Sequence, residues 1–198
     1  KVGDDNALPA SRENVLVTAG ATNALSATVQ ALVDSGDDVM VLSPYWPFFR
    51  GMVRAAGGNV VEVPLYTTIY RHPNADVSVT LESRLTPKTV ALYLNSPNNP
   101  SGKVLSRTQL EAVANFAKRH DLWLVSDEAY DGMTFDGRAH VSPGSFDRMF
   151  ERTVSVFTFS KVFMFAGLRL SYAVAGERVI RAIKKAMVDQ LYSPSPVA

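Results

Sequence analysis

Lys161 has the sequence surroundings that most suggest chemistry. It follows a β-type run at residues 153–157 and is flanked by apolar side chains, Phe159, Val162, Phe163 and Phe165. An apolar environment favours the neutral amine of a lysine, which is a nucleophile and a Schiff-base former. The alternative is a surface lysine whose ammonium reaches into water, and the apolar flank argues against it. The sequence therefore predicts a desolvated, reactive amine at position 161.

Asp127 and Glu128 follow a second β-type run, at residues 122–126, and Tyr130 comes two positions later. Successive side chains of a strand point to opposite faces, so one carboxylate can enter a site while the other points away. A carboxylate at a strand end in a low-dielectric cleft can hold a proton on a heterocyclic nitrogen. A helix cap is the alternative for Asp127 taken alone.

Two loops also carry groups that bind ligands. Gly20-Ala21-Thr22 joins a strand to a helix start, where free backbone N–H groups and the helix dipole suit an anion such as phosphate. A helix cap by Thr22 is the alternative. The stretch Asn95–Gly102 contains two prolines and three asparagines, which make a stiff turn that presents side-chain amides. A plain turn is its alternative.

Composition excludes several classes of function. The chain has 198 residues, a formal net charge of +1 and no cysteine, so neither a nucleic-acid partner nor a thiolate metal site is indicated. His72, His120 and His140 lack metal-ligand spacing. Neither P-loop nor dinucleotide fingerprint occurs. No apolar run is long enough to span a bilayer and no signal peptide opens the chain, which favours the cytoplasm and no membrane partner.

The elements that must position these residues alternate along the chain. Strand patterns occupy residues 15–18, 39–42, 60–63, 90–94, 122–126, 153–157 and 170–175, and helix patterns occupy 22–33, 48–56, 106–120 and 177–191. Residues 66–86 have little periodicity and are expected to be loop with fragments of structure. This order predicts an α/β fold, a three-layer αβα arrangement with a mostly parallel central sheet. Ligands of such sheets bind at the carboxyl ends of the strands, where all four motifs fall.

The motifs in this order resemble those of the class I/II aminotransferases, the fold-type-I enzymes that use pyridoxal 5'-phosphate (PLP). The resemblance runs from about Val15 to Ala186. It is carried by G-A-T-x-A-L, P-Y-W, N-x-P-N-N-P-S-G, D-E-A-Y and S-K, with Arg169 eight residues after the lysine. Each motif alone is weak, but the ordered set is highly specific. The resemblance implies that residues 1–192 form a PLP-binding large domain and that 193–198 are a linker or truncated tail.

The resemblance also implies roles for individual residues. Lys161 forms a Schiff base with PLP and moves the proton of the substrate, and Asp127 pairs with the pyridine nitrogen. Asn99 and Tyr130 hydrogen-bond the oxygen of the ring. Trp46 stacks on the ring, with Tyr45 as the less favoured stacker. Asn99–Pro100 is a candidate cis peptide. The phosphate is held by the backbone of Ala21 and Thr22, the hydroxyls of Thr158 or Ser160, and Arg169.

The chain also departs from the family pattern. Members are about twice as long, and the arginine that grips the substrate carboxylate lies in a C-terminal part that nothing here matches. Phe163-Met164-Phe165 replaces smaller residues, and Ser171 stands where glycine is usual. The chain is therefore expected to be the large domain without its N-terminal arm and small C-terminal domain.

The expected function is transfer of an amino group from an amino acid to a 2-oxo acid, with a homodimer as the expected assembly. Alternatives are a PLP-dependent lyase or synthase of the same fold and a PLP-binding fragment without turnover. A Ser/Lys hydrolase using Ser160 and Lys161 is less favoured, because adjacent side chains point apart and no G-x-S-x-G elbow is present.

Overall fold

A seven-stranded sheet forms the centre of the chain in the computed structural model, which describes residues 1–191 and 193–194. The spatial order is β1-β7-β6-β5-β4-β2-β3. Strand β7 runs antiparallel to both of its neighbours, and the other neighbouring strands are parallel. The strands are β1 (Val15–Ala19), β2 (Asp38–Leu42), β3 (Asn59–Val63), β4 (Thr89–Asn95), β5 (Trp123–Asp127), β6 (Thr153–Thr158) and β7 (Leu170–Val174).

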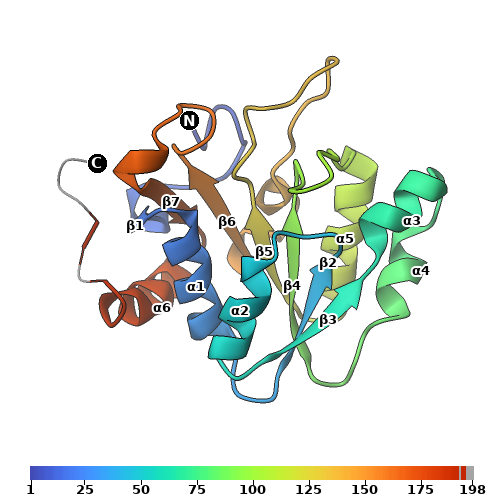
Figure 1. Cartoon of the computed structure of the whole chain (residues 1–198), viewed down its shortest axis with the longest axis horizontal. Coiled ribbons are helices and arrows are strands. Elements are labelled where there is room, and N and C mark those ends of the chain that lie inside the picture. Colours follow the sequence, from blue (N-terminus) through green and yellow to red (C-terminus); the bar gives the residue numbers. More distant parts are fainter. Residues whose placement is uncertain (192, 195–198) are drawn as a thin grey trace.

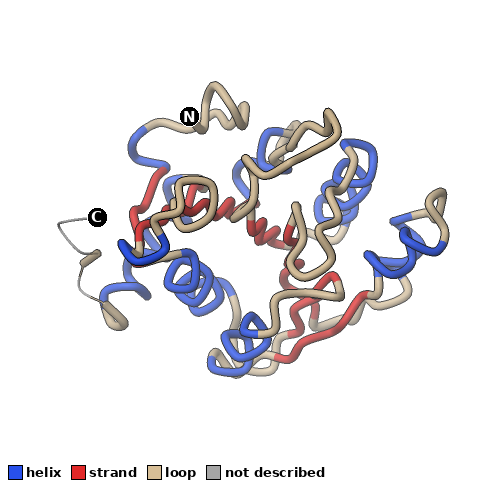
Figure 2. Tube along the Cα trace, turned by 45° about the horizontal axis from the view of Figure 1, so that its top comes forward, coloured by secondary structure: helices blue, strands red, loops and turns tan. Residues whose placement is uncertain are grey.

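Helices cover both faces of this sheet, as Figure 2 shows with helices on either side of the strands. Helices α1 (Ala21–Leu32), α2 (Phe48–Ala55) and α6 (Glu177–Val188) enclose one apolar core, and α3 (Leu65–Arg71), α4 (Val77–Glu82) and α5 (Arg107–Arg119) enclose the other. The two groups lie on opposite sides in Figure 1. Short 3-10 helices at Arg12–Asn14, Pro143–Ser145, Phe150–Arg152 and Ala166–Leu168 join the main elements. The predicted three-layer α/β fold is confirmed.

The two cores follow from the two-residue period of the strands. In β4, Ala91 and Tyr93 enter the core under α1 and α2, while Leu92 and Leu94 enter the core under α5. Both faces are buried, so the strand reads as a continuous apolar run in the sequence. The same alternation in β5 sends Asp127 and Glu128 to opposite sides of the sheet.

Most predicted elements agree with the structure within a few residues, and α5 begins after Ser106, whose side chain caps it. Residues 66–86, expected to be loop with fragments of structure, contain most of α3 and all of α4. The last helix, predicted to reach about residue 191, ends at Val188. The alternative that Thr22 caps α1 is wrong, because Thr22 lies inside this helix and the cap position is Gly20.

The predicted tail at 193–198 lies largely outside the described residues, and Ser193 and Pro194 belong to no helix or strand. The domain boundary at 192 stays a prediction. Within the described part of the chain, no helix is long and apolar enough to cross a membrane.

Candidate functional site

A cavity of about 170 Å³ lies at the carboxyl ends of the central strands. The ends of β4, β5 and β6 and the start of α1 meet at this edge of the sheet (Figure 1). All ten residues that the sequence predicted for the site line this cavity: Ala21, Thr22, Trp46, Asn99, Asp127, Tyr130, Thr158, Ser160, Lys161 and Arg169. Four further lining residues were not predicted: Leu25, Asn95, Ala129 and Ala166.

Asp127 is the buried acid of the cavity, with 5% of its surface exposed. Its Oδ2 accepts a hydrogen bond from the Tyr93 hydroxyl at 2.8 Å, and its Oδ1 accepts one from the backbone N–H of Ala129 at 3.2 Å. Burial raises the pKa of Asp127 to about 6, and the Tyr93 hydrogen bond opposes this rise. Asp127 ends β5 and a turn follows it, so the helix-cap alternative is wrong.

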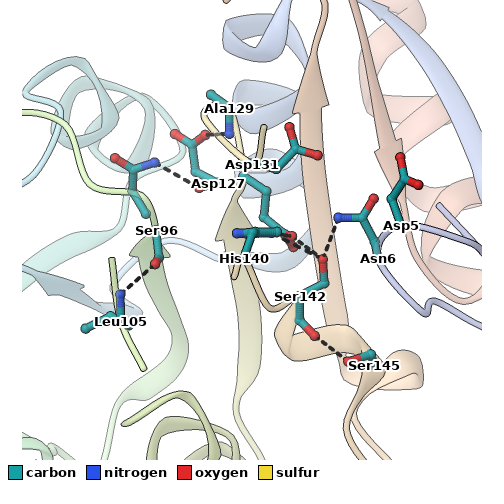
Figure 3. Close-up of polar contacts among 12 residues, drawn as sticks. Asp5, Asn6, Ser96, Leu105, Asp127, Ala129, Asp131, His140, Ser142 and Ser145 are labelled. Atoms are coloured by element: carbon teal, nitrogen blue, oxygen red, sulfur yellow. Dashed lines mark hydrogen bonds and ion pairs between the residues drawn. The ribbon is translucent and has the colours of Figure 1, made fainter. Parts of the chain in front are cut away.

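Glu128 points away from the cavity, as its position after Asp127 predicted. It is fully buried, and its Oε2 contacts His140 Nε2 at 2.7 Å and accepts a hydrogen bond from the Ser142 hydroxyl. Asn6 Nδ2 donates to the same hydroxyl at 3.1 Å. Figure 3 shows His140, Ser142 and Asn6 converging on the side opposite to the Asp127 carboxylate. This network therefore anchors the loop that carries Tyr130.

The asparagine-rich turn is fixed by its own side chains. Asn95 Nδ2 donates to the Asp127 carbonyl at 2.8 Å, and the Asn99 N–H donates to Asn95 Oδ1 at 2.6 Å. Asn99 Nδ2 lies 3.4 Å from the Tyr130 hydroxyl, which brings the two predicted ring-oxygen donors together. The Asn99–Pro100 peptide is cis as predicted. Ser43–Pro44 and Ser96–Pro97 are also cis, which the sequence did not predict.

Lys161 lies at the rim of the cavity, with Nζ 5.5 Å from the centre of the Tyr130 ring. The prediction that its apolar neighbours desolvate it was wrong. Lys161 is exposed, and so are Val162, Phe163 and Phe165, because the loop after β6 turns these side chains outward. The partner of Lys161 inside the chain is therefore the aromatic ring of Tyr130 rather than an apolar pocket.

Arg169 lies against the start of α1, where the backbone of Gly20 leaves room for it. A Cβ at Gly20 would overlap Arg169 Nη2. A guanidinium and the positive end of a helix dipole repel each other, so an anion between them stabilises this arrangement. The hydroxyls of Thr22, Thr158 and Ser160 line the same cavity, which makes this end of it suitable for a phosphate.

Ser171, which stands where the family pattern has glycine, is buried behind this anion site. Its hydroxyl donates to Thr158 Oγ1 at 2.7 Å, and Thr158 Oγ1 accepts from the Ser160 N–H at 3.1 Å. The serine therefore orients the Thr158 hydroxyl, a function that no spacing in the sequence suggested.

Trp46, rather than Tyr45, faces the cavity. The Tyr45 hydroxyl donates to Glu62 at 3.1 Å and accepts from Arg50 Nε at 2.9 Å, and Tyr45 does not line this cavity. A larger cavity of about 900 Å³ shares Asn99 and Tyr130 with the smaller one and is lined by Arg71, Lys103 and Arg138 among others. Among the described residues, no group of histidines and carboxylates could hold a metal ion.

Comparisons with known proteins agree with this geometry. The profile of the family described as "Aminotransferase class I and II" matches residues 1–198. The chain is 40% identical to the aspartate/prephenate aminotransferase of Thermus thermophilus over 98% of this chain and 49% of that protein. It is 33% identical to the human kynurenine–oxoglutarate transaminase 3 over 92% of this chain and 42% of that protein.

Solved structures of aminotransferases also resemble this chain. The aspartate aminotransferase from Thermus thermophilus with maleate superposes with a TM-score of 0.91 at 39% identity, covering 98% of this chain and 50% of that chain. An aromatic aminotransferase from Pyrococcus horikoshii superposes with a TM-score of 0.92 at 35% identity, with coverages of 98% and 52%. The chain spans about half the length of the curated relatives it matches. It belongs to the class I and II aminotransferase family.

Proposed function

We propose that this chain is the PLP-binding half of an aminotransferase, with Lys161 as the residue that attaches the cofactor. The observation that carries the proposal is the cavity itself, because one space joins a lysine, a buried carboxylate, an Asn–Tyr pair and an anion site. The relatives transfer amino groups to and from aspartate, prephenate, kynurenine and oxoglutarate according to their names. The substrates proposed here are accordingly an amino acid and a 2-oxo acid.

The residues present fit PLP in charge and in shape. Gly20 and Arg169 form a cradle that a Cβ at position 20 would fill, and it suits the phosphate. Asp127, at the other end of the cavity, suits a protonated ring nitrogen, because a buried carboxylate is stabilised by a cation. Trp46 supplies an aromatic face between the two ends.

Each residue then has a distinct task. When bound, PLP supplies the electron sink that stabilises negative charge at the substrate α-carbon. Asp127 holds the proton on the ring nitrogen, and Asn99 and Tyr130 hydrogen-bond the ring oxygen. Arg169, Thr158 and Ser160 hold the phosphate, together with the backbone of Ala21 and Thr22. With the cofactor bound, the freed amine of Lys161 would accept the proton from the substrate α-carbon and donate it to the cofactor carbon that the lysine had held, as a general acid–base.

A homodimer is part of the same proposal. The loop after β6 exposes Val162, Phe163, Met164, Phe165 and Leu168, with Met164 87% exposed. Contiguous exposed apolar side chains are typical of surfaces that another chain covers. Sedimentation velocity that finds only monomer at all concentrations would contradict this assembly. The cytoplasmic location stays a prediction.

Reductive labelling tests the cofactor assignment. The protein is incubated with PLP, reduced with borohydride and digested, and the labelled peptide is expected to contain Lys161. Lys161→Ala should abolish the label and the visible absorbance band. Lys103→Ala is the matched control, since this lysine lines only the larger cavity and should leave both unchanged. A label at another lysine in the unaltered protein would refute the assignment.

A half-reaction distinguishes the type of chemistry. Conversion of the loaded protein to its pyridoxamine form by an amino acid identifies an aminotransferase. Release of pyruvate and ammonia instead would identify the carbon–sulfur lyase alternative.

A further inference from the structure

Tyr93 lies directly beneath the candidate site, in β4, and none of its side chain is exposed. Its ring belongs to the core under α1 and α2, on the same face of the sheet as Asp127. Tyr93 pairs with Val125 in the parallel register of β4 and β5, and Asp127 is two residues farther along β5. This diagonal offset is within reach of an aromatic side chain, and the Tyr93 hydroxyl donates to Asp127 Oδ2 at 2.8 Å.

Packing fixes the position of this hydroxyl. The ring of Tyr93 stacks on Phe49 of α2, with 3.7 Å between centroids and 16° between planes. The hydroxyl therefore cannot leave Asp127 without disturbing a fully buried aromatic pair. Since burial and the nearby carboxylate raise the pKa of Tyr93 well above its ordinary value, the phenol stays protonated and remains a donor.

The hydrogen bonds leave Asp127 with a defined free direction. Oδ2 accepts from Tyr93 below and Oδ1 accepts from the Ala129 N–H, while the remaining lone pairs of the carboxylate are available to the cavity. Thr22, Leu25 and Trp46 face the cavity from α1 and the segment before α2 and carry no charge. Two charged groups act on Asp127: Glu128, behind the sheet, raises its pKa and Lys161 lowers it. Arg169 lines the same cavity. The neutral Tyr93 hydroxyl is thus the side-chain donor to Asp127, and its hydrogen bond stabilises the ionised form of this carboxylate.

We propose that Tyr93 is a positioning residue of the cofactor site, whose hydroxyl keeps the Asp127 carboxylate ionised and aimed at the ring nitrogen. The inference rests on the proposed function, because it assigns Tyr93 a part in binding PLP through Asp127. An ionised Asp127 favours a proton on the ring nitrogen. The positive charge there repels a proton on the lysine-linked nitrogen at the other end of the conjugated system, so this nitrogen loses its proton at a lower pH.

Tyr93→Phe tests the inference, since it removes only the hydroxyl and retains the ring that stacks on Phe49. The readout is the pH midpoint at which the visible band of the lysine-bound cofactor titrates. A hydrogen bond to a charged group is strong enough to change a proton affinity by about tenfold or more, and part of that effect reaches the far end of the ring. The midpoint of Tyr93→Phe should rise by roughly 0.5–1 pH unit, a three- to tenfold gain in proton affinity. Asp127→Asn should raise it at least as far.

Tyr172→Phe is the matched control. Tyr172 lies in β7, stacks on Phe157 with 5.3 Å between ring centroids, and lies outside the cavity, so its midpoint should equal that of the unaltered protein. A Tyr93→Phe midpoint equal to that of the unaltered protein would overturn the inference, whatever its effect on stability. If Tyr93→Phe does not fold, Phe49→Leu loosens the same ring, and it should raise the midpoint in the same direction, whereas an unchanged midpoint overturns the inference.

Failure of the proposed function would be distinct. In that case borohydride fixes no label on Lys161 of the unaltered protein, and no variant has a visible band to titrate. A labelled Lys161 together with an unchanged midpoint in Tyr93→Phe refutes only the role of Tyr93.

Discussion

Gly20 and Arg169 illustrate how one backbone position controls the proposed phosphate site. Gly20 has φ +85°, a conformation that residues with a side chain rarely adopt, and the Arg169 guanidinium occupies the space where its Cβ would be. Arg169 itself has φ +54° and donates from Nη1 to the Ala166 carbonyl at 2.9 Å. A hydrogen bond within its own loop therefore fixes the arginine, and the absence of a side chain at Gly20 leaves the space that its guanidinium occupies.

Substitution of Gly20 by alanine should separate strain from the loss of the anion site. Gly20→Ala is expected to cost about 1–3 kcal/mol of stability, because φ +85° with ψ 158° is a conformation almost restricted to glycine, and to displace Arg169. Gly36→Ala is the control, because Gly36 has φ +92° and no heavy atom within 4 Å of an added Cβ. Urea unfolding should show a loss of stability in both variants. Absorbance titration should show PLP binding weakened at least about tenfold in Gly20→Ala alone, an effect of the size expected for a displaced charged hydrogen bond. Equal affinities in the two variants would contradict this role of Gly20.

The sequence predicted well those helices and strands that are marked by patterns of neighbouring residues. The strands read as apolar runs between turn residues, and Ser106 with Gln109 forms a capping box at the start of α5. The ten predicted site residues belong to motifs that follow strands, and the carboxyl ends of the strands meet at one edge of the sheet, so the sequence predicted that they lie together. The short helices α3 and α4 were missed because six or seven residues carry too little periodicity to identify a helix.

Features that depend on strand register could not be predicted in this way. In the sequence, Tyr93 resembles any other core residue of an apolar run, because its hydrogen-bond partner Asp127 lies 34 positions later. Asn6 and Ser142 are 136 positions apart. The exposure of Lys161 was mispredicted, because burial depends on which distant elements cover a loop rather than on its neighbours in sequence. Contacts of this kind emerge only when β4, β5 and β6 are aligned.

The Glu128 network shows how elements are joined behind the site. Ser142 donates to Glu128, which follows β5, and accepts from Asn6 near the start of the chain, so one hydroxyl links three segments. Glu128 Oε1 has no hydrogen-bond partner among the residues that the structure describes. The loss of one donor to a buried carboxylate is therefore expected to be costly.

Ser142→Ala should lower the free energy of unfolding by about 2 kcal/mol, since it leaves the buried Glu128 with fewer donors. Ser145→Ala removes a hydroxyl three residues away that donates to the Ser142 carbonyl at 2.7 Å, and it should cost about 1 kcal/mol or less. Urea unfolding of the two variants measures the difference. Equal losses would mean that Glu128 does not depend on the Ser142 hydroxyl.

At the scale of the whole molecule, the sheet buries the site acid between two cores, and this burial links the stability of the chain to pH. The pKa of Asp127 rises from its ordinary value of 3.8 to about 6 in the folded chain, mainly because burial disfavours the carboxylate. The folded state therefore binds a proton more tightly than the unfolded state. The sign of the linkage follows: between about pH 4 and 6 the folded chain carries more protons than the unfolded chain, so stability falls as pH rises through this window.

Asp127→Asn isolates this contribution, because the amide cannot titrate while most other groups remain as they are. Without PLP, the free energy of unfolding of the unaltered protein should fall relative to that of Asp127→Asn by roughly 3 kcal/mol between pH 4 and 7, with most of the change below pH 6. Urea unfolding across this range measures the difference. With PLP bound, a protonated ring nitrogen beside Asp127 offsets the cost of the buried charge, so the fall should shrink. A difference between the two proteins that is constant with pH would show that Asp127 titrates in the folded chain as it does in the unfolded one. In that case the sheet would not create the buried acid on which both the cofactor site and the role of Tyr93 depend.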